Sequence, residues 1–146
     1  MQVDFYHLTV RPLDRVLPQI AARVVAGGGR MLVVSEAAAQ LAALDRALWT
    51  YQPESFLPHA IAGGEDDTGQ PVLLSSDIAP TNGARNVALA DGRWRDAALG
   101  FDRVFHLFDE ATLAGARSAW RDLGARDGLE RRYWKQKEGG GWERAA

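Results

Sequence analysis

The first fifty residues alternate between strand-like and helix-like segments, and this order constrains the fold more than any other feature. Residues 3–8 are short, aromatic and β-branched, as in a strand. Apolar residues then recur at helical spacing, glycines at 27–29 end that segment, and residues 30–35 form a second strand-like run. Pro18 falls inside the helical segment, so we expect the helix to begin near it. The β-α-β-α order favours a parallel sheet covered by helices.

The rest of the chain extends this pattern less evenly. It predicts two further helices, at 36–49 and 111–123. It also predicts three further strands, at 72–75, 87–90 and 103–108. Asp109 is a candidate N-cap for the last helix. With 146 residues and no repeat or linker, we expect one domain over residues 1–146, an α/β fold of three layers with a mostly parallel central sheet. A basic and aromatic tail over about 129–146 would be either ordered or flexible.

Composition excludes several classes of protein. The chain has no cysteine and only three histidines, so disulfide frameworks and thiolate metal sites are excluded. No apolar run approaches the roughly 20 residues that cross a bilayer, and the N-terminus has no signal-peptide pattern. We therefore expect a cytoplasmic protein with no membrane contact, no metal and no cofactor.

Motifs for nucleotide binding and catalysis are missing. The glycines at 27–29 follow a helix and precede a strand, the reverse of the order in a phosphate-binding loop. Ser35 has no recognisable base and is better interpreted as a cap of the following helix, and His106 as packed beside the sheet. The acidic cluster at 65–67 is typical of a solvated turn. We expect no catalytic residues, while a small α/β hydrolase or nucleotide-binding domain using Ser35, His59 or His106 remains the alternative.

Charge and helical spacing indicate one candidate binding surface near the C-terminus. Residues 117–146 carry a net charge of +3 although the whole chain carries −2, which favours a local anionic partner or else a solvated helix. Arg117 and Arg121 are one helical turn apart, and Trp120 lies beside them at the edge of an apolar stripe. Such an arrangement suits an acidic peptide with an aromatic anchor. Equally, Trp120 would be core and both arginines merely solvated.

A second candidate surface follows the predicted helix 36–49. Trp49, Phe56 and Leu57 fall close together in a stretch that Pro53 and Pro58 keep irregular. Aromatic side chains in such loops are common anchors of protein–protein contacts. They could also cover the edge of the sheet.

Several blocks of residues keep one order along nearly the whole chain. They are Phe5-Tyr6, LDRALW at 44–49, PESFLPHAIAGG at 53–64, DRVFHLFDEATLAGARSAWR at 102–121, YWKQ at 133–136 and GGW at 140–142. In these blocks the sequence resembles the chi subunit family of bacterial DNA polymerase III, accessory proteins of the clamp-loader complex. The resemblance implies a single α/β domain with a Rossmann-like topology but no nucleotide site, and a non-catalytic role in DNA replication.

The resemblance also implies two partners. The acidic, phenylalanine-ended C-terminal tail of the single-stranded-DNA-binding protein would bind at Arg117, Trp120 and Arg121. The psi subunit of the clamp loader, or a helicase-like repair protein, would bind at the second surface, whose matching residues are Trp49, Pro53, Phe56 and Leu57.

The tail after residue 128 leaves further alternatives open. It would fold over the peptide site or add Arg132 and Lys135 to it. DNA would be reached only indirectly in this interpretation. Direct binding of single-stranded DNA through Tyr133 and Trp134 is a rival, which the negative net charge disfavours.

Overall fold

A computed structural model describes residues 1–51 and 57–146. The strands are β1 (Gln2–His7), β2 (Met31–Val34), β3 (His59–Ile61), β4 (Val72–Ser75), β5 (Asn86–Leu89), β6 (Arg103–Phe108), β7 (Glu130–Gln136) and β8 (Trp142–Arg144). The helices are α1 (Leu13–Ala26), α2 (Ala38–Thr50) and α3 (Leu113–Leu123), with short 3₁₀ turns η1 (Asp67–Gly69), η2 (Asp96–Gly100) and η3 (Glu110–Thr112). None of the helices in these two ranges is both long and apolar enough to span a bilayer.

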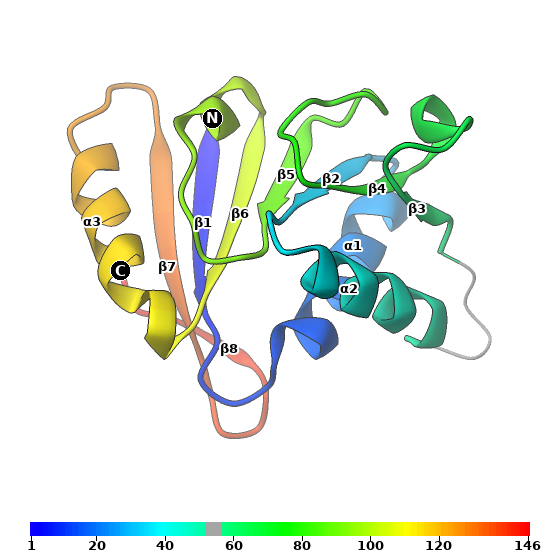
Figure 1. Cartoon of the computed structure of the whole chain (residues 1–146). Helices are drawn as coiled ribbons and strands as arrows, with labels where there is room; N and C mark the ends of the chain where they lie inside the picture. Colours follow the sequence, from blue (N-terminus) through cyan, green and yellow to red (C-terminus); the bar gives the residue numbers. More distant parts are fainter. Residues whose placement is uncertain (52–56) are drawn as a thin grey trace.

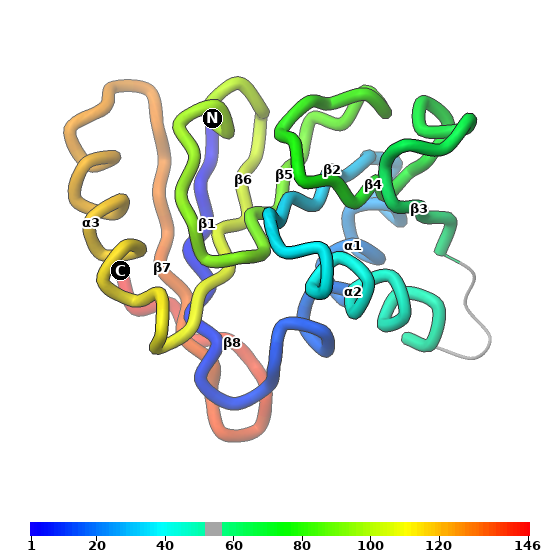
Figure 2. The backbone as a smooth tube through the Cα atoms, viewed as in Figure 1, coloured from blue at the N-terminus to red at the C-terminus, as the bar shows by residue number. Residues whose placement is uncertain are grey.

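The strands form one sheet in the order β3-β4-β2-β5-β6-β1-β7-β8. All neighbours run parallel except β7 and β8, which are antiparallel. Helices α1 and α2 pack on one face of the sheet, and α3 with η2 packs on the other. Figure 1 shows α3 beside β7 and β1, and α1 and α2 towards the β3 end, and Figure 2 traces the backbone in the same view. The predicted three-layer α/β fold with a mostly parallel sheet is therefore confirmed.

The central strands are buried on both faces of the sheet, which explains why they could be recognised in the sequence as apolar runs. Every residue of β2 and β4 is buried, as expected for central parallel strands covered by helices. In β1 the side chains alternate, with Phe5 packing towards α3 and Tyr6 towards α1. The sheet thus separates two hydrophobic cores.

The start of α1 differs from the prediction. The helix begins at Leu13, and Pro18 lies inside it rather than in its first turn. The backbone N–H groups of Arg15 and Val16 both donate to the carbonyl oxygen of Pro12, which starts the helix a turn earlier. Pro18 removes one helical hydrogen bond to Asp14, an exposed residue whose carbonyl water can reach, and its own ring is buried in the core.

The predicted C-terminal end of α1 is confirmed, whereas the predicted cap residue Asp109 caps the 3₁₀ turn η3, which comes directly before α3. α1 stops at Gly27, and Gly28 adopts a φ of 85°, a left-handed conformation that favours glycine. Asp109 accepts a hydrogen bond from the backbone N–H of Thr112, whose hydroxyl accepts one from the Asp109 N–H. This reciprocal capping box precedes α3.

Three strands were not predicted. β3 lies in the stretch expected to be loop, and β7 and β8 follow Gly128 in the stretch expected to be a tail. β7 pairs in parallel with β1 along its whole length, from Gln2 opposite Glu130 to His7 opposite Lys135. Because backbone pairing does not depend on side-chain polarity, the charged sequence of β7 still extends the sheet.

Gln136 ties β7 to the loop between β1 and α1. Its Oε1 atom accepts hydrogen bonds from the backbone N–H groups of Thr9, Val10 and Arg11, at 2.9, 2.9 and 3.1 Å. The residue is only 6% exposed, so these bonds are shielded from water on the Gln136 side. These hydrogen bonds therefore fix the loop between β1 and α1 to β7.

Replacing Gln136 by leucine should destabilise the fold. The leucine keeps the bulk but leaves the loop amides without an acceptor, so we expect a loss of about 1–3 kcal/mol in the free energy of unfolding. Urea denaturation measures the change, with exposed Lys137→Ala as control, expected within about 0.5 kcal/mol of wild type. Equal stability of the two variants would show that the three bonds contribute nothing.

His106 is a core residue, as the sequence predicted. It is fully buried, its ring contacts Phe5, Trp94 and Phe108, and neither ring nitrogen has a hydrogen-bond partner among the described residues. Burial lowers the pKa of His106 from 6.5 to about 4, because the charged imidazolium would lose its hydration.

This burial predicts a specific loss of stability in acid. The unfolded chain takes up the His106 proton near pH 6.5 but the folded chain only near pH 4, so falling pH favours unfolding between these values. Between about pH 7 and pH 4.5, wild type should lose about 2 kcal/mol more than His106→Phe. Urea titrations at both pH values measure the difference, and parallel losses in the two proteins would contradict it.

Candidate functional site

The three residues predicted to bind an acidic peptide share one wall of the molecule. Arg117, Trp120 and Arg121 lie on α3, which runs beside β7 (Figure 1). Both arginines are exposed and Trp120 is half-buried. We call these residues, with Arg131 and Tyr133 of β7, the α3–β7 surface.

Trp120 belongs both to this surface and to the core. Its ring meets Phe5 and Tyr133 edge to face, with centroids 5.3 and 5.7 Å apart. The Arg131 guanidinium lies 3.9 Å from its ring centroid, and Arg131 also donates a hydrogen bond to the Trp120 carbonyl oxygen. The indole is therefore held in one position. Trp120 packs partly in the core, and its role in peptide binding stays a prediction.

The two arginines of α3 keep their charges available. Within residues 1–51 and 57–146, no carboxylate lies within ion-pair distance of Arg117 or Arg121. Burial raises the pKa of the Tyr133 hydroxyl, the positive charge of Arg117 opposes that rise, and the negative charge of Glu110 adds to it. Two unneutralised guanidinium groups beside an aromatic floor can bind carboxylates.

The floor of the α3–β7 surface also contains a histidine. The Tyr133 hydroxyl lies 3.4 Å from Nδ1 of His7, and Nε2 of His7 lies 3.0 Å from Oε1 of Glu110. The Glu110 side chain is thus in contact with His7, while it stays 75% exposed.

Sequence reasoning missed Arg131 and misplaced Arg132. Side chains alternate along β7, so Arg131 and Tyr133 contact α3, while Arg132 points to the opposite face and lies 3.5 Å from the Asp4 carboxylate. The prediction that Arg132 joins the peptide site is therefore wrong. Lys135 comes two residues after Tyr133 in β7, so it lies on the same face of the sheet, and it is exposed. The alternation of side chains with a period of two residues could have identified β7 as a strand. It was missed because this segment was interpreted as a tail.

The second predicted surface is only partly described. Trp49, at the end of α2, is 55% exposed, and its ring lies 4.6 Å from that of His59 on β3. Leu57 is 7% exposed and packs in the core, so it supports the segment without reaching solvent. Pro53 and Phe56 lie outside the described residues.

His59 fixes the position of β3 under Trp49. Its Nδ1 and the Leu57 carbonyl oxygen are 2.7 Å apart, and its Nε2 lies 3.2 Å from the Asp45 carboxylate. The ring is buried and its nitrogens are engaged in local contacts. This geometry suits a structural histidine that supports an exposed indole.

The two surfaces lie far apart. β3 and β7 are separated by six strand-to-strand steps in the sheet. With ~4.8 Å between neighbouring strands, this corresponds to roughly 29 Å. The two surfaces are therefore separate regions of the molecule.

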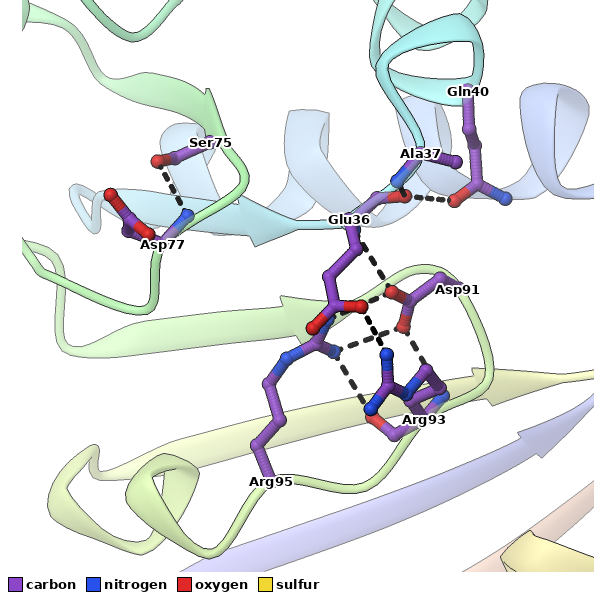
Figure 3. Close-up of polar contacts among 9 residues, drawn as sticks. Glu36, Ala37, Gln40, Ser75, Asp77, Asp91, Arg93 and Arg95 are labelled. Atoms are coloured by element: carbon purple, nitrogen blue, oxygen red, sulfur yellow. Dashed lines mark hydrogen bonds and ion pairs between the residues drawn. The ribbon is translucent and has the colours of Figure 1, made fainter.

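The predicted catalytic alternative finds no support in the contacts of Ser35. Its hydroxyl donates to Oε1 of Gln40 and accepts a hydrogen bond from the backbone N–H of Ala37, at 2.5 and 3.1 Å. The second contact closes a turn just before α2, whose N-cap residue is Ala37 and which has no side-chain cap, so the interpretation of Ser35 as the cap of this helix is wrong. Figure 3 shows Ala37 and Gln40 within the polar network at the carboxyl ends of β2, β4 and β5.

The acidic member of that network is also fully engaged. Burial alone would raise the pKa of Asp91, but hydrogen bonds from Arg95 and from the backbone N–H groups of Glu36 and Arg93 lower it to about 2 (Figure 3). Asp91 is thus a fixed anion that joins the loop after β5 to the loop after β2. In the part of the chain that the structure describes, no cluster of three or more His, Asp or Glu side chains could hold a metal ion.

Comparison with known proteins agrees with the resemblance read from the sequence. The family model described as the DNA polymerase III chi subunit, HolC, matches residues 1–130. The DNA polymerase III subunit chi of Escherichia coli (strain K12) is 31% identical over 78 residues. That alignment covers 53% of this chain and 53% of the relative, so it spans about half the length of each. Because the family model covers most of the chain, including α3 and Trp49, this protein belongs to the DNA polymerase III chi subunit family.

Proposed function

We propose that this protein is a non-catalytic accessory subunit of the bacterial DNA polymerase III holoenzyme, acting in the cytoplasm where the chromosome is copied. It would link the clamp-loader complex to the single-stranded-DNA-binding protein. The observation that carries the proposal is the pair of exposed guanidinium groups, Arg117 and Arg121, which have no carboxylate partner among the described residues and flank the half-buried Trp120.

The α3–β7 surface has the chemistry that an acidic chain end requires. Arg117 and Arg121 would bind the side-chain and terminal carboxylates, and a terminal phenyl ring would pack beside Trp120 and Tyr133. Charge-assisted hydrogen bonds contribute about 1.5–3 kcal/mol each where water is partly excluded. Arg131 stabilises the site from below, because it holds the indole in place.

The second surface would dock on the clamp-loader side. Trp49 supplies a large exposed aromatic ring at one end of the sheet, and Pro53 and Phe56 follow it in the sequence. The psi subunit, or a helicase-like repair protein, is the proposed occupant. Since the two surfaces are roughly 29 Å apart, one chain could hold both partners and raise their effective concentration without binding DNA itself.

An acidic peptide that ends in phenylalanine should bind wild type with micromolar affinity. Arg117→Ala and Arg121→Ala should each weaken binding by at least ~10-fold, because each removes a charge-assisted contact. Higher salt should weaken wild-type binding, since part of the interaction is ionic. Isothermal titration calorimetry measures all three effects.

Arg15→Ala is the matched control for this titration. Arg15 is an exposed arginine on α1, on the other face of the sheet, and its loss changes the net charge equally. It should bind the peptide as wild type does. If all three variants bind equally, or if a peptide without the terminal phenylalanine binds as well, the α3–β7 surface is not the site.

Trp49→Ala should weaken binding of the psi subunit by ~30-fold or more and leave the acidic peptide unaffected. An exposed tryptophan at the centre of an interface commonly contributes about 2 kcal/mol or more. Surface plasmon resonance with immobilised psi measures the change, with Val10→Ala as control for another exposed apolar side chain. Unchanged psi binding by Trp49→Ala would exclude this surface.

A further inference from the structure

The loop between β1 and α1 has the backbone geometry of an anion site. Three successive N–H groups, those of Thr9, Val10 and Arg11, converge on one oxygen atom, Oε1 of Gln136. Successive backbone N–H groups that point at one position form a concavity that binds anions. We propose that this loop is a binding site for a small oxyanion such as phosphate, which the chain keeps closed with the side chain of Gln136.

The position of the loop in the sheet supports the proposal. β1 and β6 are neighbours, yet the helices that follow them, α1 and α3, pack on opposite faces of the sheet. Ligands of open α/β sheets bind outside the carboxyl ends of strands at such a switch point. A cavity of about 360 Å³ opens there, lined by residues of the loops that follow β1, β5 and β6. The amino end of α1 adds its partial positive charge.

Gln136 is an imperfect occupant of this site. The residue is more than nine-tenths buried and its amide is inserted among the three donors, yet its Nε2 atom has no hydrogen-bond partner among the described residues. A neutral amide therefore satisfies the donors with its oxygen and leaves its own N–H groups unpaired. A group with oxygens only would satisfy the same donors without that cost.

The β7–β8 turn closes the site from outside. Gly140 has a φ of 87°, and a Cβ atom there would lie 2.6 Å from Nε of Arg11, so the guanidinium lies directly against the turn. Arg11 thus adds a positive charge to the loop that carries the three donors. Two carboxylates line the same cavity: Asp91 is paired with Arg95, and Asp109 caps the 3₁₀ turn η3.

Removing the side chain of Gln136 should open the site. In Gln136→Ala, millimolar inorganic phosphate should raise the melting temperature more than chloride at equal ionic strength, because a ligand that binds the native state stabilises it. Wild type and Lys137→Ala should show no such difference. The proposal is overturned if Gln136→Ala shows no phosphate-specific rise, or if all three proteins rise equally.

Gln136→Glu tests the same site without an added ligand, and remains informative if the alanine variant does not fold. A carboxylate there would accept the three N–H bonds, so the pKa of the introduced carboxyl group should fall well below that of an ordinary glutamate. A titration followed by carbon NMR measures it, with Lys137→Glu as exposed reference. An ordinary or raised pKa at position 136 would contradict an anion site.

Discussion

A buried carboxylate holds together the three strands on which the α3–β7 surface depends. Asp4, on β1, is 1% exposed and lies 3.1 Å from the Arg103 guanidinium of β6 and 3.5 Å from that of Arg132 on β7. The indole N–H of Trp134 donates to the same carboxylate at 3.0 Å. A buried charge is tolerated only when it is paired in this way, so Asp4 favours one register of β6, β1 and β7.

That register determines what each face of β7 can do. Arg132 and Trp134 turn towards Asp4 on the α1 face, which leaves Arg131 and Tyr133 to contact α3. The aromatic contacts from Phe5 through Trp120 to Tyr133 therefore depend on the pairing of β7 with β1. Trp134 is engaged with the core of the opposite face, which disfavours the single-stranded-DNA interpretation of this strand.

The sequence predicted the elements whose own residues form an apolar run or a cap. It did not predict those that depend on pairing with a distant part of the chain. β4 and β6 were predicted with their observed bounds because both are apolar runs, and Asp109 was recognised as a cap from its position alone. β7 was missed because its charged side chains mask a strand that β1 recruits from more than a hundred residues away. Helical spacing placed Arg117, Trp120 and Arg121 on one wall, but no local pattern could show Arg131 stacked on the indole.

Several polar groups at the carboxyl ends of the strands are engaged with one another. The loop amides at residues 9–11 are bound to Gln136, Ser35 to Gln40, and Asp91 to Arg95. These contacts tie together the edge of the sheet at which open α/β folds bind ligands. Arg117 and Arg121, which have no ion-pair partner among the described residues, lie away from that edge on α3. The positive charge on which the proposed peptide site depends is therefore carried by a helix and not by the crevice.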